Sequence, residues 1–326
     1  MSSKYVLPFS IDVEMRMYQD KAFPLGIIKA NLNDYDIWLC GKLINCVYKY
    51  SGVFDVIDDD LWSINDGLAF VQNIYVAPES LAFSGFDLIE FNKSMLRTGH
   101  YITGTYNEYY IPGKHAYLNY DFNHDYVIFG YDDSTKVFKS ATYLPNSMYG
   151  YVDITYDDYL QAVTMNKISR ANVDYFQINS SYVPNIEVTA LVSKLKDYLY
   201  CKKNGQTVDD RVFGVNVWSE LAKYVLSVKE NIDLRYGRMY MEYHGLMLKR
   251  IQVLKKLGYI DNAILEQKYQ ELYHCASQVH HSFIKYNLTH KSDLLERISS
   301  LINNTTNEEK KLIEVLIKDL AGREDI

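Results

Sequence analysis

The apolar residues of this chain repeat at two different spacings, and the change falls near Pro184. Between Tyr101 and Thr155, short apolar segments are separated by Gly, Pro, Asn and Asp residues, which is typical of strands joined by turns. After Pro184, apolar residues recur every three or four positions with charged residues between them, which is typical of amphipathic helices. The sequence therefore predicts an α+β chain, with an antiparallel sheet followed by a helical bundle.

This pattern divides the chain into a domain at residues 1–184 and a helical domain at residues 185–326. Asn33 and Asp34 can cap an earlier helix, which we expect to run from about Tyr35 to Tyr50. Strands are expected at residues 101–105, 116–120, 126–130, 136–142 and 151–154. Helices of the second domain are expected at residues 186–203, 216–231, 233–257, 262–286, 292–302 and 307–320.

Composition and charge narrow the class of protein. The 326 residues are enough for one large domain or two smaller ones. A formal net charge of -7 argues against a nucleic-acid binder, since such proteins need a clustered basic surface. We see neither an apolar run of the roughly 18 residues that a membrane span requires nor the apolar stretch of a secretory signal. A cytoplasmic protein is therefore expected.

The cysteines and histidines do not predict a metal site. The four cysteines are too few and too scattered for a disulfide framework, so reduced thiols are expected. His274, Cys275 and His281 are ligand types, but helical spacing turns Cys275 away from the face that the two histidines share. We expect no metal and no cofactor.

Cys40 is the first candidate for chemistry. It would lie within the first two turns of the expected helix, where the partial positive charge of the N-terminus lowers the pKa of a thiol. Gly41 beside it would let a substrate carbonyl approach closely. The alternative is that Cys40 is a small buried apolar residue, and this is the simpler reading for Cys46 one and a half turns later.

His124 is the second candidate, because it precedes an apolar strand and its imidazole would project from the start of that strand. We expect a hairpin tip near Asp133 and Ser134, which would bring residues 141–143 back opposite His124. No carboxylate stands there to orient the imidazole. Thr142 and Asn146 are therefore the nearest side chains that could assist His124 or an oxyanion.

Several segments together resemble a known family. Cys40 and Gly41, followed by a stretch that ends in YKYSG at residues 48–52, are similar to the opening of the peptidase C39-like papain fold. The segment GHYITGTYNEYYIPGKHAY at 99–117, with HDYVIFGYDD at 124–133, resembles the butirosin-H-like group within that fold. The resemblance continues at 149–156 and, more loosely, at 212–215, 233–235 and 242–244.

What this resemblance implies is a papain-like domain that transfers an acyl or peptidyl group from a carrier-protein thioester to an amine. An enzyme of the closthioamide kind, which forms amides with a diamine, is one concrete version. Cys40 then matches the nucleophile and His124 the general base. Two positions depart from the family pattern: the acidic residue expected near Ala141 is missing, and Asp34, with Asn33 beside it, replaces the oxyanion-assisting glutamine.

Further contacts to substrate are expected from Tyr109, which lies in a tyrosine-rich run, and from Arg235 and His244 on a later helix. The implied partners are an acyl or peptidyl carrier protein and a small amine acceptor, with a homodimer as one alternative for the assembly. Two other functions stay open. One is a cysteine peptidase or thioesterase with water as acceptor, and the other is a catalytically silent protein for binding or self-protection.

Overall fold

The computed structural model describes residues 3–58, 61, 69–74, 85, 87–144, 148–165, 173–179, 181–207 and 210–322. The chain forms two compact units. Unit 1 comprises Met1–Asn33 and Trp62–Tyr182, and unit 2 comprises Asp34–Leu61 and Val183–Ile326. The later division lies close to the expected boundary after residue 184, but residues 34–61 belong with the helical unit and not with the sheet. None of the helices in the described ranges is long and apolar enough to span a bilayer.

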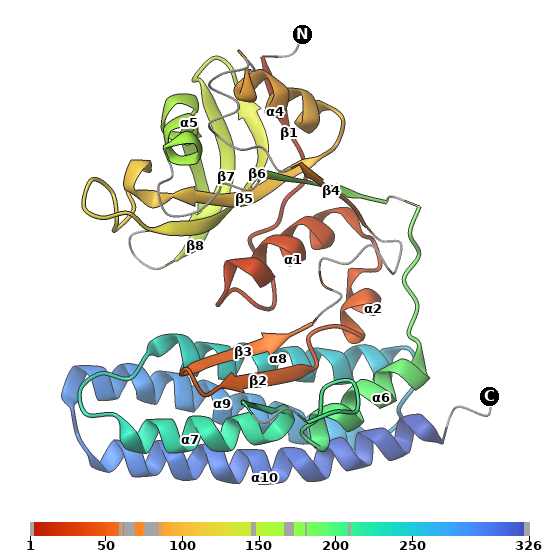
Figure 1. The fold of residues 1–326 in the computed structure, drawn as a ribbon. Helices are drawn as coiled ribbons and strands as arrows, with labels where there is room; N and C mark the ends of the chain where they lie inside the picture. Colours follow the sequence, from red (N-terminus) through yellow and green to blue (C-terminus); the bar gives the residue numbers. More distant parts are fainter. Residues whose placement is uncertain are drawn as a thin grey trace. The chain divides into compact units, whose positions relative to one another are not determined.

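Unit 1 is built on one antiparallel sheet, drawn in the upper part of Figure 1. Its strands follow the order β4-β9-β5-β6-β7-β8, and β1 also pairs with the far end of β6. The bounds are β1 Lys4–Val6, β4 Ala69–Ile74, β5 Tyr101–Asn107, β6 Asn123–Asp132, β7 Val137–Tyr143, β8 Tyr149–Thr155 and β9 Val173–Ile178. The antiparallel sheet that the sequence predicts is confirmed.

Helices cover both faces of this sheet. Successive side chains of β6 point to opposite faces, so its apolar residues pack against a different set of helices on each side. Val127 and Phe129 pack with helix α1 (Gln19–Asn31) through Phe23 and Ile27. Residues Tyr126 and Ile128 pack in the opposite cluster, to which helices α4 (Leu88–Arg97) and α5 (Tyr156–Thr164) contribute. The start of α1 and the start of β6 therefore both belong to the framework of unit 1.

The connection from β5 to β6 is a 3-10 turn, η2 (Glu108–Tyr110), followed by further turns to residue 122. The expected strand at 116–120 is wrong. Asn107 closes this connection at its base, since its Oδ1 accepts from the amides of Tyr109 and Phe122, each at 3.0 Å. The side chain thus replaces the ladder bonds that would otherwise continue the strand.

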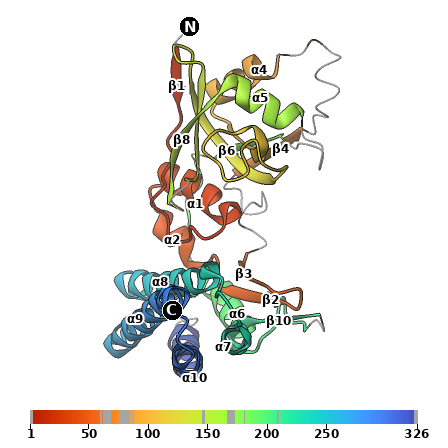
Figure 2. The same ribbon diagram turned by 90° about the vertical axis from the view of Figure 1, so that its left-hand side faces the viewer.

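Unit 2 contains the expected helical bundle, seen from two sides in Figures 1 and 2. Its helices are α6 Val188–Leu199, α7 Val217–Ser227, α8 Leu234–Lys256, α9 Ala263–Thr289 and α10 Asp293–Ala321. The last is one helix where the sequence predicts two. Thr305 and Thr306 do not interrupt it, because their hydroxyls donate to the carbonyls of Leu301 and Ile302 one turn earlier, both at 2.8 Å.

Residues 34–61 add a short helix and a hairpin to unit 2: α2 Tyr35–Cys40, β2 Asn45–Lys49 and β3 Val53–Ile57, with β10 Arg211–Phe213 on the other edge of β2. The expected helix from 35 to 50 is therefore wrong beyond Cys40. Arg250 of α8 binds the chain where the helix ends, since it donates to the carbonyls of Cys40 at 2.8 Å and Lys42 at 2.6 Å. Leu43 then takes a φ of 54°, which turns the chain into β2.

Candidate functional site

His124 and Glu108 are the centre of a hydrogen-bonded group of charged and polar side chains in unit 1. Tyr106 of β5 pairs directly with His124 of β6, and Glu108 follows two residues later at the start of η2. The Nδ1 atom of His124 lies 2.8 Å from Oε1 of Glu108. An ionised carboxylate has no proton to give, so the imidazole must donate through Nδ1. The strand pairing thus supplies the carboxylate that the sequence did not show opposite His124.

Lys114 contacts the same carboxylate oxygen of Glu108 as His124 does. Its Nζ atom lies 3.1 Å from Oε1 of Glu108 and donates to Oγ1 of Thr142 at 2.5 Å. Gln19, at the start of α1, also donates to that hydroxyl, at 2.9 Å. Four segments far apart in the sequence therefore meet in one network, which we call the His124 network: Gln19, Glu108, Lys114, His124 and Thr142.

Burial and charge act against each other in this network. Burial alone would raise the pKa of Glu108, but the hydrogen bond from His124 and the charge of Lys114 outweigh it, so this pKa lies below its ordinary value. Burial lowers the pKa of Lys114, with Glu108 opposing the change. The side chains of Glu108 and Lys114 are each 8% exposed, whereas that of His124 is 34% exposed. The imidazole is therefore the member that solvent or a substrate can reach.

Such an imidazole has the geometry of a general base. A carboxylate on Nδ1 fixes the tautomer, so the other ring nitrogen, Nε2, carries the lone pair. No hydrogen bond to Nε2 is found among the described residues. When Nε2 takes up a proton, the same carboxylate stabilises the imidazolium. The network can thus accept a proton from a bound nucleophile.

The side chains expected opposite His124 lie elsewhere on β7. Ala141 pairs with Val127, three residues further along β6 than His124, and the pairing has a register irregularity between Ile128 and Gly130. Thr142 still joins the network, but through Lys114 and Gln19 and not by facing the imidazole. Asn146 lies outside the described residues.

Cys40 has an environment unlike the expected one. It is the last residue of α2, so it lies at the carboxyl end of a helix, where the partial charge is negative and disfavours a thiolate. The residue is 2% exposed, and its sulfur lies 4.0 Å from the carbonyl oxygen of Arg250. Burial raises the pKa of Cys40 to about 11, although the charge of Arg250 opposes this. These surroundings are those of a structural thiol.

Cys40 and His124 also fall in different units. Cys40 belongs to unit 2 and His124 to unit 1, so neither unit contains the expected pair. All four cysteines lie in the sequence ranges of unit 2, and unit 1 has none. Asn33 and Asp34 are exposed where the chain passes from one unit to the other, and Asp34, at the N-cap of α2, makes no side-chain bond to the helix amides.

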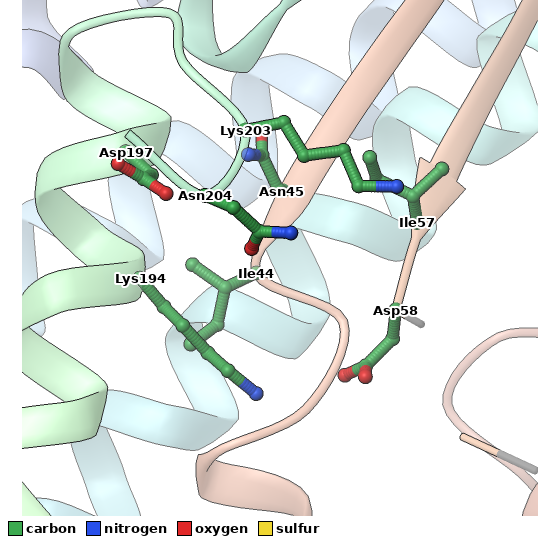
Figure 3. A pocket seen from close by; sticks show the side chains of 8 residues that line it. All are labelled: Ile44, Asn45, Ile57, Asp58, Lys194, Asp197, Lys203 and Asn204. Carbon is green, nitrogen blue, oxygen red and sulfur yellow. The ribbon is translucent and has the colours of Figure 1, made fainter. Parts of the chain in front are cut away.

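A pocket of about 160 Å³ lies in unit 2 near the turn that follows Cys40 (Figure 3). Its walls come from α6, from the loop after it, and from the ends of β2 and β3 that lie side by side. The lining residues in the described part are Ile44, Asn45, Ile57, Asp58, Lys194, Asp197, Lys203 and Asn204. Cys40 is not among them, so the pocket gives no access to its sulfur.

The three residues expected to contact substrate have separate surroundings. Tyr109 lies in η2 next to Glu108, with its ring 5.0 Å from that of Tyr110. Arg235 is the second residue of α8 and binds the N-cap residue Asp233 through Nη2 at 2.6 Å. His244 is completely buried inside the bundle, where Nδ1 contacts the carbonyl of Tyr240 at 2.8 Å, so it does not reach a substrate at the surface.

Within the residues that the structure describes, no three His, Cys, Asp or Glu side chains gather closely enough to hold a metal ion. The chain matches no protein-family model and no curated protein.

Proposed function

We propose that this protein is an acyl-transfer enzyme of the butirosin-H-like, papain-like kind in which His124 is the general base and no cysteine is the nucleophile. The resemblance supplies the substrate class, an acyl thioester on a carrier protein with an amine as acceptor. The chemistry is direct attack of the amine on the thioester. The observation that carries the proposal is the 2.8 Å contact between Nδ1 of His124 and the buried carboxylate of Glu108.

The reaction needs one proton to move twice. The amine nitrogen attacks the thioester carbonyl, and Nε2 of His124 takes the proton that this nitrogen loses. The tetrahedral intermediate then collapses, the C–S bond breaks, and the imidazolium returns the proton to the leaving thiolate. Glu108 stabilises the imidazolium between the two steps. The products are an amide and a free carrier thiol, and no acyl-enzyme forms.

A catalytically silent protein that binds the same class of ligand is the second candidate. The observation that favours it is that unit 1 contains no cysteine at all, so His124 has no thiol partner in its own unit. The two candidates share the ligand site and differ in turnover. With water in place of the amine, the first candidate becomes a thioesterase.

The test offers the full-length protein an N-acetylcysteamine acyl thioester with a diamine, and follows the amide by mass spectrometry. His124→Gln should lower the rate by about 10²- to 10⁴-fold, as expected for loss of a general base. Glu108→Gln should also lower it, because the imidazole loses its negative partner. Cys40→Ala should keep most of the rate, and His274→Gln, which changes an exposed histidine of α9, serves as the matched control.

Loss of turnover in Cys40→Ala, with an acyl adduct on Cys40 in the wild type, would overturn the proposal in favour of thiol catalysis. Absence of turnover in the wild type, together with thioester binding that His124→Gln weakens, would establish the silent protein instead. An unchanged rate in His124→Gln would remove the His124 network from the mechanism.

A further inference from the structure

The loop that precedes His124 exposes an unusual set of apolar side chains. Tyr117 is 38% exposed, Leu118 64%, Tyr120 44% and Phe122 44%, all within six residues. Single exposed apolar residues are ordinary, but a contiguous group of them marks a binding surface more often than chance. These four residues follow directly on the segment that carries Glu108 and Lys114, and they end two residues before His124.

The loop holds these side chains in fixed places. Ile111 and Ala116 are buried and anchor it from inside. The amide of Leu118 donates to the carbonyl of Tyr109 at 3.0 Å, and the amide of Tyr120 to that of Ala116 at 3.2 Å. Leu118 also has a φ of 51°, a conformation that costs a leucine about 1 kcal/mol or more. The apolar side chains are therefore presented outward by an ordered turn.

The rings of this loop form a continuous series that reaches His124. The ring of His115 lies 5.9 Å from that of Tyr120, the ring of Tyr120 6.3 Å from that of Phe122, and the ring of Phe122 5.4 Å from the imidazole of His124. Nδ1 of His115 also contacts the hydroxyl of Tyr120 at 2.9 Å. We call His115, Tyr120, Phe122 and His124 the aromatic strip.

We propose that the aromatic strip binds the acyl group of the thioester and that this acyl group is aromatic. The inference rests on the proposed function, since it assigns a substrate class to the same site. The strip ends at the ring of His124, so an acyl group lying along Phe122 and Tyr120 would be held beside the general base. The Tyr120 and Phe122 rings meet edge to face at 6.3 Å, and the Phe122 and His124 rings are tilted to one another at 5.4 Å. A planar aromatic group gains from such ring contacts beyond its buried area.

The experiment compares a benzoyl with an acetyl N-acetylcysteamine thioester on the full-length protein. Phe122→Ala should lower kcat/KM for the benzoyl substrate by about tenfold, the effect of losing one ring contact and its buried area. It should lower kcat/KM for the acetyl substrate less than for the benzoyl substrate, because an acetyl group does not extend along the strip and loses only the effect of the Phe122 ring on His124. Phe122→Leu should be intermediate for the benzoyl substrate. Tyr200→Ala, which removes an exposed ring in unit 2, is the matched control.

A second measurement separates this inference from the function. The affinity for a benzoyl thioether analogue, which cannot react, is measured by calorimetry in wild type, Phe122→Ala and His124→Gln. Weaker binding in Phe122→Ala supports the strip even if no turnover is found. Equal affinity in wild type and Phe122→Ala, or equal loss of the benzoyl and acetyl rates, overturns the inference. The proposed function is tested separately, by the rate of the His124→Gln variant.

Discussion

The reactivity of a single thiol follows from its ionisation, and Cys40 is held in its neutral form. With a pKa of about 11, about one molecule in a thousand carries the thiolate at pH 8. The thiolate fraction rises with pH, so labelling should accelerate tenfold per pH unit until that value is reached. Enclosure of the sulfur slows the reaction further.

We therefore expect iodoacetamide at pH 8 to label the half-buried Cys275 in the native protein well before Cys40. Peptide mass mapping at successive times gives the order of labelling. In denaturant all four cysteines should react at similar rates, which checks that each one is detected. Selective labelling of Cys40 near pH 6 in the native protein would show a thiolate and contradict this description of its surroundings.

At the residue scale, the sequence could suggest His124 but not its partner. Glu108 and His124 are sixteen positions apart, and they meet because β5 and β6 pair with Tyr106 opposite His124. The register in which two strands pair is a tertiary property, so no local sequence pattern could predict that Glu108 and Lys114 lie near His124. The expected position of Cys40 near the start of a long helix was wrong for a related reason, because α2 ends at Cys40.

At the element scale, β6 pairs with three strands, β1, β5 and β7, and Gly130 permits the pairing with β1. A Cβ atom at Gly130 would lie 2.7 Å from the carbonyl oxygen of Tyr5 and 2.9 Å from Cα of Val6. Both distances are shorter than van der Waals contact, and both involve backbone that cannot move without breaking the β1–β6 pairing. The absence of a side chain is what lets β1 lie against β6.

Gly130→Ala should therefore destabilise the protein by about 1 to 3 kcal/mol, the usual effect of overpacking. Urea unfolding followed by circular dichroism measures the change. Gly41→Ala is the control, because its Cβ would meet nothing closer than 4.0 Å, and a change within about 0.5 kcal/mol is expected there. Equal stability of Gly130→Ala and wild type would mean that β1 does not lie against β6 in solution.

The strands β5 to β8 and the bundle helices could be predicted because their apolar periods extend over many residues. The region from 35 to 50 could not. Its residues fit a helix by period, but Arg250 binds the carbonyls of Cys40 and Lys42 from a helix two hundred positions later. A distant side chain therefore decides where α2 ends and where β2 begins.

At the scale of the whole molecule, the helical unit is incomplete without residues 34–61. The hydroxyl of Tyr243 donates to the carbonyl of Ile44 at 3.0 Å, and the buried guanidinium of Arg250 loses two acceptors if residues 40–42 are removed. A buried charge without its hydrogen-bond acceptors is strongly destabilising. A cut at the boundary that the sequence suggests would therefore remove part of the core.

A fragment of residues 185–326 should accordingly unfold without a cooperative transition, or aggregate. A chain that joins residues 34–61 to residues 183–326 by a flexible linker should melt cooperatively. Thermal melts followed by circular dichroism compare the two. A sharp transition in the shorter fragment, at the same temperature as in the joined chain, would show that the bundle is complete without residues 34–61.

The placement of residues 34–61 has a consequence for biosynthesis. This segment leaves the ribosome before every strand of the unit 1 sheet except β1. Its partners on α8 are translated about two hundred codons later. At ordinary elongation rates the delay is on the order of ten seconds or more. During that interval the apolar side chains of α2 and β2 lack their partners on the bundle helices, although β2 can already pair with β3. Chaperone capture of the nascent chain is therefore expected to concentrate on this segment.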